Sequence, residues 1–491
     1  MGFLPITILL IMLATAAVVV FEKNIAAAKK LAMAGHLLAL ALSAMMLEYS
    51  ARAPISVLVG PEPWNFYVLV MPLDAFMVFL FVGISTIIVW ASFSMIEHDI
   101  EPGRVPAYYA LICALVATLC GVAIFENFFN IFLLLELSSF AAVGIVIIKK
   151  KPENMKAGLK YLTLSILGSS FILMGIIIMY FVTDSLSIIG VQASLTDFTG
   201  YEESVRNALI FIAIGTALKS ALFPLHIWLP DAHGTAPSPS SAILSGLVLK
   251  AYIFLYIKIL YKAVGAETLA SDPVLAQMQA IMMIAGVVAM LAGSAFALAQ
   301  TDIKRMIAYS SVAQIGYIFM GIGMGTRAGL FAAMFHILAH AVTKPLLFLV
   351  AGGIIEQTHN RAIAGMGGLG YKMRISMALF TLGALSMVGI PLFIGFNSKW
   401  YFAEAIIYAE HFWILGALAF SALLNGSYYL PVSVRAFFGR EAVEAAAANV
   451  SVERPLKDLA PVICFAVLIV ALALFSWPVT AYLHMGIDAI W

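Results

Sequence analysis

The fold is decided by the stretch Thr216-Ala-Leu-Lys219-Ser-Ala-Leu-Phe-Pro224-Leu-His226-Ile-Trp-Leu-Pro230. It begins in an apolar run, 207–224, that is long enough to lie within a lipid bilayer. A charged side chain at the centre of a membrane helix costs roughly 2.5–3.5 kcal/mol on insertion scales. A proline removes one helical hydrogen bond and frees a carbonyl, which inside a membrane is tolerated only where it faces protein or water. The stretch therefore predicts a broken membrane helix with a functional lysine, Lys219, beside the break.

A second stretch has the same features and reads Leu385-Ser-Met-Val-Gly-Ile-Pro391-Leu-Phe-Ile-Gly-Phe-Asn397-Ser-Lys399. The fragments Phe-Pro224-Leu-His-Ile and Ile-Pro391-Leu-Phe-Ile align without a gap. Paired interrupted helices at corresponding positions indicate a transporter built from inverted repeats. Prolines are common in membrane helices, so the buried lysine beside each break is what strengthens the match. The predicted units are 1–105, a first repeat 106–261, a second repeat 277–434 and a C-terminal part 435–491.

The composition is that of a membrane protein. Of the 491 residues 63% are hydrophobic and 11% are charged, and the mean hydropathy is +1.02, far outside soluble usage. In lipid the apolar runs must be α-helices, because each backbone polar group needs a partner within its segment. They lack the alternation of a β-barrel. We predict an all-α polytopic protein with about fourteen transmembrane helices, two inverted five-helix repeats and two broken helices. The runs are 3–21, 31–48, 67–95, 106–124, 127–148, 159–183, 207–224, 240–261, 277–299, 305–324, 328–350, 375–407, 412–434 and 460–482.

The positive charges orient the chain. With an outside N-terminus, eighteen lysines and arginines fall in inside loops, five in outside loops and four within the membrane. The positive-inside rule then predicts that both termini lie outside. The first run has no positive n-region and no clear cleavage site, so we expect a retained helix. The three cysteines have no metal or disulfide spacing, and a net charge of +1 suggests no nucleic-acid partner.

Glu136 is the only charge in 131–148, and Lys250 resembles Lys219 in having apolar sequence on both sides. Burial disfavours an ammonium ion and a nearby carboxylate favours it, so a lysine whose acidic partner approaches and withdraws can load and unload a proton. We predict that Glu136 and Lys219 are such a pair, with Lys250 as the next proton carrier. The alternative is that the lysines reach the headgroups, which we expect of Lys258 and Lys262.

The second half offers His336, His340 and Lys344, spaced i, i+4, i+8 on one helix face. Histidine titrates near physiological pH and suits a proton relay. The alternatives are a zinc site, which lacks the metalloprotease glutamate and a third ligand, and histidines that only join helices by hydrogen bonds. Lys399 would close this half on the outer side of the Pro391 break, unless it merely pairs with Glu404. Asp302 is placed to cap the N-terminus of the helix predicted at 305–324.

Two segments are specific enough to identify a resemblance. The first reads Lys219-Ser-Ala-Leu-Phe-Pro-Leu-His-Ile-Trp-Leu-Pro-Asp-Ala-His233, followed by Ala236-Pro-Ser-Pro. The second reads Asp302-Ile-Lys-Arg, followed by Ala308-Tyr-Ser-Ser. On these residues, and over nearly its whole length, the chain resembles the antiporter-like membrane subunits of respiratory complex I, of energy-converting membrane-bound hydrogenases and of Mrp-type cation/proton antiporters.

The resemblance implies a fourteen-helix fold with two inverted repeats, broken seventh and twelfth helices and a midplane chain of polar residues. Glu136 looks like the fifth-helix glutamate, and Lys219 and Lys250 look like the seventh- and eighth-helix lysines. Lys399 takes the twelfth-helix position, where some complex I subunits carry glutamate, so lysine argues against that subtype. We expect no long lateral helix after the last run. The eleventh helix carries His336, His340 and Lys344, and the accessory polar residues are His226, His233 and Asp302.

Three functions compete at this point. The first is a proton-translocating subunit of a redox-driven complex in the inner membrane of a prokaryote. The second is the Na⁺/H⁺ exchange subunit of an Mrp-type antiporter. The third is a stand-alone transporter of an organic solute, which would need a substrate pocket with specific polar groups and is disfavoured because the helices offer mostly proton-relay residues. The expected partners are other membrane subunits, including homologous ones. The chain carries no redox-cofactor motif, so electron transfer would belong to those partners and we expect no cofactor here.

Overall fold

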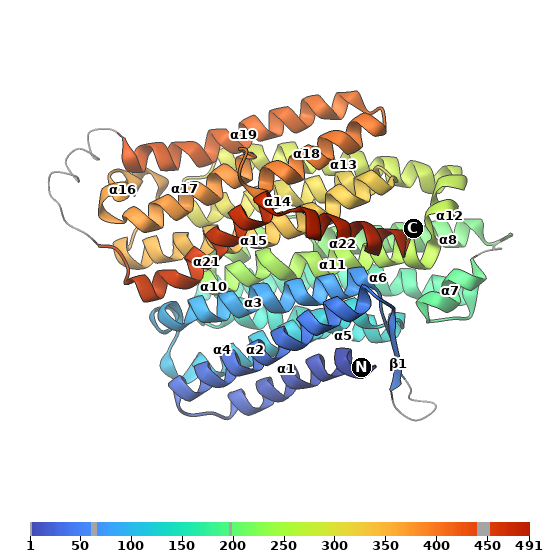
Figure 1. Ribbon diagram of the computed structural model, residues 1–491, viewed down its shortest axis with the longest axis horizontal. Helices are drawn as coiled ribbons and strands as arrows, with labels where there is room; N and C mark the ends of the chain where they lie inside the picture. The colour runs from blue at the N-terminus through green and yellow to red at the C-terminus, as the bar shows by residue number, and fades with distance from the viewer. Residues whose placement is uncertain (1, 60–65, 196–198, 439–451) are drawn as a thin grey trace.

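The protein, in a computed structural model, is a single bundle of long helices that lie side by side (Figure 1). The structure describes residues 2–59, 66–195, 199–438 and 452–491. Within these ranges eleven helices are long and apolar enough to cross a membrane. The chain is therefore an all-α polytopic membrane protein, as predicted. The number of crossings and the inverted relation of the two repeats stay predictions.

The helices before the second repeat are α1 (Leu4–Val20), α2 (Ile25–Ser50), α3 (Pro72–Asp99), α4 (Val105–Ile124), α5 (Phe128–Ile147), α6 (Pro152–Thr183), α7 (Ile188–Ser194), α8 (Glu202–Lys219), α9 (Leu229–Thr235), α10 (Ser238–Ile243), α11 (Leu249–Ile257) and α12 (Ala266–Ser271). The later helices are α13 (Pro273–Leu298), α14 (Ile303–Gly323), α15 (Arg327–Thr358), α16 (Leu369–Lys372), α17 (Arg374–Val388), α18 (Ile394–Tyr408), α19 (Phe412–Phe437), α21 (Leu456–Leu474) and α22 (Trp477–Asp488). Short 3₁₀ turns are η1 (Pro102–Arg104) and η4 (Ile363–Met366). Two π-helical segments, η2 (Leu244–Val248) and η3 (Lys258–Val264), flank α11.

Both predicted breaks interrupt a helix. α8 ends at Lys219, and α9 begins only at Leu229. Between them Ala221 has a positive φ of 59°. In the second half α17 ends at Val388 and α18 begins at Ile394, and Leu392 has a φ of 79°. An α-helix cannot continue through residues in the left-handed region, so each apolar run becomes two half-helices.

Two apolar runs differ from their predicted form. The run 67–95 was expected to be helical throughout, but its first residues form strand β2 (Phe66–Val70), which pairs antiparallel with β1 (Ile55–Val59). The helix starts only after it, at Pro72, where a proline is tolerated because its missing N–H has no helical partner. The run 460–482 was expected as one helix and instead gives α21 and α22.

The two ends of the bundle differ in what they carry. The N- and C-termini lie at the same end as β1 (Figure 1). We call this end the terminal face, and it also carries the C-terminal end of η3. We call the other end the opposite face; α3, α5 and α15 end there and α14 begins there. The sequence predicts that the terminal face is outside.

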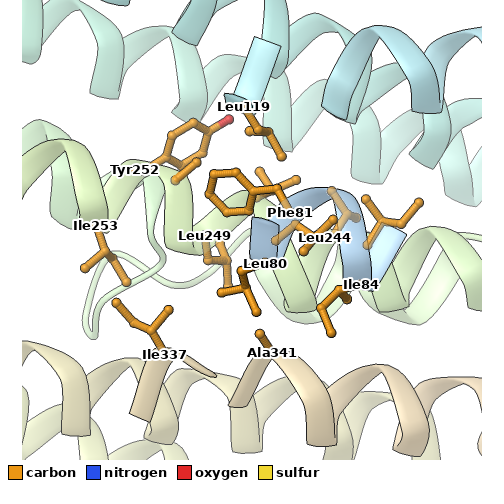
Figure 2. Close-up of a cluster of buried hydrophobic side chains, with 14 of the residues drawn as sticks. Leu80, Phe81, Ile84, Leu119, Leu244, Leu249, Tyr252, Ile253, Ile337 and Ala341 are labelled. Atoms are coloured by element: carbon orange, nitrogen blue, oxygen red, sulfur yellow. The ribbon is translucent and has the colours of Figure 1, made fainter. Parts of the chain in front are cut away.

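The centre of the bundle is a dry core around α11. Figure 2 shows Phe81 of α3, Leu249 of α11 and Ile337 of α15 among the side chains that meet there. An apolar stretch of 18 residues is entirely buried in the segment Ser238–Val264, and another in α15. Within a membrane such helices associate by close packing, because lipid tails are as apolar as leucine. Lys250 on the first of these segments, and His336, His340 and Lys344 on α15, are at most 4% exposed and are therefore surrounded by protein.

Candidate functional site: an ion-pair and histidine chain across the bundle

Glu136 and Lys219 lie together at the first break. Lys219 is the last residue of α8, and Glu136 lies near the middle of α5. Lys219 Nζ is 3.5 Å from Glu136 Oε1. The lysine side chain is fully buried, whereas 22% of the glutamate side chain is exposed. The carboxylate is thus the member of the pair that has room to move.

The Lys219 ammonium has two further partners that the sequence analysis missed. It donates hydrogen bonds to Ser139 Oγ at 2.7 Å and to Ser165 Oγ at 3.1 Å. The ring of Tyr252 lies 5.1 Å from Nζ, within the range of a cation–π interaction. Ser139 follows Glu136 by three positions, so one face of α5 supplies both the carboxylate and a hydroxyl. That spacing is a signal that the sequence did contain.

Close packing of α6 against α8 brings Ser165 to the lysine. A Cβ atom on Gly215 would lie 2.4 Å from the carbonyl oxygen of Gly168, and a Cβ on Gly168 would lie 3.0 Å from that of Gly215. Only glycine at both positions lets the two backbones touch. Small residues at helix contacts have this role in membrane bundles.

Lys250 lies one residue into α11, directly after the π-helical segment η2. Its Nζ donates to the carbonyl oxygen of Ser245, on the preceding turn. π-Helical turns are rare and frequently occur at functional sites. In the described part of the chain no hydrogen bond or ion pair joins Lys250 to Lys219 or to His340. Lys219 and His340, the predicted neighbours of Lys250 in the relay, are therefore not in direct contact with it.

His336, His340 and Lys399 surround a small cavity of about 10 Å³, which is lined by Gln314, His336, Ala339, His340, Thr343, Ser386, Met387, Gly395 and Lys399. The two imidazole rings stack with their centroids 6.2 Å apart. His336 Nδ1 forms a 2.7 Å hydrogen bond with Ser398 Oγ. The cavity is just large enough for one water molecule. The structure thus gathers these three predicted residues around one small polar space.

Several buried polar atoms at this cavity have no protein partner among the described residues. They are His336 Nε2, both ring nitrogens of His340 and Gln314 Nε2. Buried polar groups are normally hydrogen-bonded to protein or to ordered water. Because their side chains line one cavity, a single water could satisfy several of them. Among the described residues no three His, Cys, Asp or Glu side chains are arranged to hold a metal ion.

Lys344 turns away from the two histidines. Its Nζ donates to the carbonyl oxygen of Ile307 at 2.9 Å, to Ser310 Oγ and to Tyr429 OH at 3.2 Å. The lysine shares a helix with His336 and His340, but its ammonium faces α14 and α19. The spacing i, i+4, i+8 places the three residues along one side of α15, yet the long lysine side chain reaches a different polar group.

Lys399 lies on α18, just after the second break. Its Nζ donates to the carbonyl oxygens of Met387 at 3.0 Å and Val388 at 2.6 Å, the last residues of α17. The suggested pairing with Glu404 is not what the structure has, because Glu404 accepts from Trp400 Nε1 at 2.7 Å. The break therefore supplies the partners of the lysine: a continuous helix would use these carbonyls itself.

The accessory residues lie around the first break and at the opposite face. His226 packs among aromatic rings, with Tyr309 5.9 Å away. His233 stacks on Phe348 at 4.8 Å, and both of its ring nitrogens lack a partner within the described chain. Asp302 caps α14 by accepting from the backbone N–H of Arg305 at 2.9 Å.

A cavity of about 290 Å³ opens at the opposite face and is lined by Gly234 and Thr235, the two residues that follow His233. Lys304 lines it, although the sequence analysis gave that residue no role beyond its charge. This lysine is only 4% exposed and donates to the carbonyl oxygen of Ala236 at 2.7 Å. The other residues of the lining are Met95, His98, Asp99, Lys149, Ala236, Ser238, Gly352, Ile355, Glu356, His359 and Arg361. This polar cavity gives water a place beside the backbone that follows His233, although His233 itself does not line it.

At the terminal face four charged residues form a buried cluster, which we call the terminal tetrad: Asp74, Glu126, Lys258 and Lys262. The prediction that the two lysines reach the headgroups is wrong, since they are only 2% and 6% exposed. Lys262 Nζ donates to Glu126 Oε1 at 2.7 Å, and Lys258 Nζ lies 3.2 Å from the same oxygen. Glu126 was missed because it falls between two apolar runs. Asp74 was missed although its charge interrupts the predicted run 67–95; the structure places it in the first turn of α3.

Comparison with known proteins gives the fold and the family. The chain superimposes on a subunit of the membrane-bound sulfane sulfur reductase, an archaeal respiratory membrane complex, with a TM-score of 0.89, 23% identity and coverage of 99% of this chain and 97% of the other. For the Mrp complex from Dietzia sp. DQ12-45-1b the TM-score is 0.88, with 19% identity and coverage of 100% and 97%. At these identities the likeness establishes a shared fold.

The sequence matches go further. NADH-quinone oxidoreductase subunit N of Desulforudis audaxviator is 32% identical over 466 residues, which is 90% of each chain. The family described as NADH:quinone oxidoreductase/Mrp antiporter, TM, matches residues 126–425. These relatives are subunits of multisubunit membrane complexes. The chain belongs to the family of antiporter-like membrane subunits of NADH:quinone oxidoreductases and Mrp antiporters.

Proposed function

We propose that this chain is the proton-translocating subunit of a redox-driven, multisubunit membrane complex of the complex I or membrane-bound hydrogenase type. The observation that carries the proposal is the 3.5 Å Glu136–Lys219 pair inside the bundle, next to a helix break. The relay would consist of Glu136, Lys219, Lys250, His336, His340, Lys344 and Lys399. The protein would lie in the inner membrane of a prokaryote with both termini outside.

In the first half the pair acts as a switch. Lys219 holds a proton while Glu136 is close, because the carboxylate offsets the cost of burying an ammonium ion. When Glu136 moves toward its exposed side, the two serine hydroxyls still accept hydrogen bonds but supply no counter-charge. The ammonium then gives up its proton toward Lys250. Return of the carboxylate restores the affinity of the amine for the next proton.

In the second half a water-assisted path supports the proposal. The cavity between His336, His340 and Lys399 can hold one water, and the partnerless nitrogens that line it can exchange protons with that water. Lys344 reaches Ser310 and Tyr429 and would join the path through those hydroxyls. The polar cavity at the opposite face would admit water on the predicted inner side as far as Gly234 and Lys304, next in the chain to His233 and at the start of α14.

The alternative is a subunit that exchanges Na⁺ for H⁺ in an Mrp-type antiporter. Hard cations bind oxygen ligands, carboxylates above all. Of the seven proposed relay residues only Glu136 is a carboxylate, and the histidines and lysines of the second half would repel a sodium ion. The relay chemistry therefore favours protons. The 32% identity with a quinone oxidoreductase subunit points the same way.

The test is to purify the complex through a tag on this chain, identify its other subunits and reconstitute it in liposomes. We expect subunits with iron–sulfur clusters together with nickel or a quinone site, and proton uptake driven by their redox reaction without Na⁺ in the medium. Proton uptake is read from a pH-sensitive dye inside the liposomes. Copurification of small Mrp subunits alone, with proton movement that requires Na⁺, would establish the alternative instead.

A further inference from the structure

The ring of Tyr317 lies among the polar groups of the second half. Tyr317 belongs to α14 and is fully buried. Lys399 Nζ lies over the ring, 5.6 Å from its centroid. The imidazole of His336 stacks on the same ring, with the centroids 5.3 Å apart and the planes at 26°. One tyrosine ring thus contacts two residues of the proposed relay, one from α18 and one from α15.

The hydroxyl group of Tyr317 fixes the orientation of the ring. It donates a hydrogen bond to Ser421 Oγ of α19 at 2.9 Å, and both residues are fully buried. A buried tyrosine usually finds a partner for its hydroxyl in this way. The partner here comes from a helix that carries no proposed relay residue. The ring is therefore held in place independently of Lys399 and His336.

Lys399 is a buried lysine that has no carboxylate partner among the described residues. Its Nζ donates to the last two carbonyl oxygens of α17. The titratable side chains that face it are His336 and His340 of α15 and Tyr317 of α14, whereas α17 adds the hydroxyl of Ser386 to the same cavity. α19 and α21 also pack against α18, but within the described ranges they give the lysine no hydrogen-bond or ion-pair partner. Since no side chain here supplies a full negative charge, the face of the Tyr317 ring is the side-chain group that attracts the ammonium ion.

The lysine beside the first break has a ring partner of the same kind. Lys219 Nζ lies 5.1 Å from the centroid of the Tyr252 ring. The hydroxyl of Tyr252 lies 3.2 Å from Ser138 Oγ and 3.4 Å from Ser139 Oγ, both on α5. In each half, a buried tyrosine whose hydroxyl is held by serine thus presents its ring to the lysine beside the break. The difference is that Lys219 also has a carboxylate partner, so the ring should matter more in the second half.

We propose that Tyr317 is a positioning residue of the relay, whose ring face holds the ammonium form of Lys399 beside His336. The inference rests on the proposed function in that Lys399 is taken to carry a proton. The ring attracts the protonated amine but does not compete for the proton, because its face has no titratable atom. A neutral amine is not attracted in this way, so the ring favours the protonated form over the neutral one. The ring therefore sets the proton affinity of Lys399 and is not itself a step in the path.

The experiment measures redox-driven proton uptake by the purified complex in liposomes as a function of pH. Tyr317→Leu removes the ring face, so Lys399 should lose its proton more readily. A lysine that must be protonated in order to work then fails at a lower pH. We expect the alkaline half-maximal point of uptake to move down by about one pH unit, a tenfold loss of proton affinity. Tyr317→Phe keeps the ring and should leave that point unchanged.

Phe402→Leu is the matched control for the loss of a buried ring. Phe402 is fully buried, and its ring packs on Tyr317 at 5.9 Å and on His336 at 5.5 Å. Among the described residues no cation lies over it. Its loss should lower the midpoint of thermal unfolding of the complex, as Tyr317→Leu does, but should leave the alkaline point in place. A shift of equal size in Phe402→Leu would mean that packing sets the proton affinity, and would overturn the inference.

A double-mutant cycle tests the contact without turnover. Tyr317→Leu should lower the midpoint of thermal unfolding more in the wild-type complex than in the Lys399→Met complex, because the latter has no cation over the ring to lose. An unmoved alkaline point in Tyr317→Leu, or equal losses of midpoint in the two backgrounds, overturns the inference. Full driven uptake by Lys399→Met refutes the proposed function instead, and the cycle then still decides whether the ring holds the ammonium.

Discussion

Replacement of Glu136 by glutamine tests the switch most directly. The side chain keeps its size and its place on α5 but loses its charge, so the buried ammonium of Lys219 loses the one carboxylate that pairs with it among the described residues. The hydrogen bonds to Ser139 and Ser165 remain. Any effect on transport then reports the charge of the carboxylate and not the packing of the helix.

The size of the effect follows from the distance between the charges. At 3.5 Å and an effective dielectric constant of about 20, the attraction is about 5 kcal/mol. The hydroxyls of Ser139 and Ser165 still accept from the ammonium in the variant and offset part of this loss, so we take about 2–3 kcal/mol. At 1.4 kcal/mol for each factor of ten, the equilibrium between the protonated and the neutral lysine shifts roughly 30- to 140-fold toward the neutral form. Glu136→Asp retracts the carboxylate by about 1.5 Å, keeps about 3 of the 5 kcal/mol and should retain part of the activity.

The assay is redox-driven proton uptake by the purified complex in liposomes, normalised to the amount of assembled complex. We expect uptake by the Glu136→Gln complex to fall about 30-fold or more, with subunit composition unchanged. Glu404→Gln serves as the control, because Glu404 is exposed on α18 and, within the described ranges, accepts a hydrogen bond from Trp400 alone. If the Gln variant retained a third or more of wild-type uptake, Lys219 would not depend on this carboxylate and the switch would be refuted.

The remaining predictions concern the helix breaks and the packing around them. Lys399→Met should stop driven proton uptake because it removes the amine, and Lys399→Arg should also stop it because a guanidinium hardly deprotonates. Normal uptake with arginine would mean that the residue supplies only a fixed charge. Pro224→Ala and Pro391→Ala should lower uptake at near-normal expression, since a continuous helix would reuse the carbonyls freed at each break; a structure of either variant with the break intact and full uptake would contradict this. Gly215→Ala should lower the midpoint of thermal unfolding of the complex by forcing α6 away from α8, at a cost of about 1–3 kcal/mol. Gly416→Ala, where the added Cβ meets nothing within 4 Å, is the control and should unfold at the wild-type temperature.

The sequence was informative where a charge interrupts an apolar run. Glu136 and Lys219 stand out for that reason, and the structure places them together. The prolines at 224 and 391 likewise indicate where helices stop. Each of these signals is local, because a single residue that is costly in lipid needs a compensating partner.

The rest could not be predicted because it depends on which helix ends meet. Lys258 and Lys262 lie at the end of a run and look like residues that reach the headgroups; only the packing of η3 against the link after α4 buries them with Glu126. Lys344 follows the histidines in sequence, but its partners come from α14 and α19. Strand β2 is continuous in hydrophobicity with α3, so hydropathy alone could not separate them.

Lys219 and Lys399, the lysines beside the two helix breaks, have counter-charges of different kinds. The ammonium of Lys219 faces a side chain that can swing away, whereas that of Lys399 faces the carbonyl end of α17, whose peptide dipoles act as about half a negative charge. A backbone terminus cannot withdraw without remodelling the helix. In the proposed relay the two halves would therefore be unequal partners. A neighbouring subunit would gate the first half by moving one carboxylate, while the second half would offer a permanently polarised resting place for the proton.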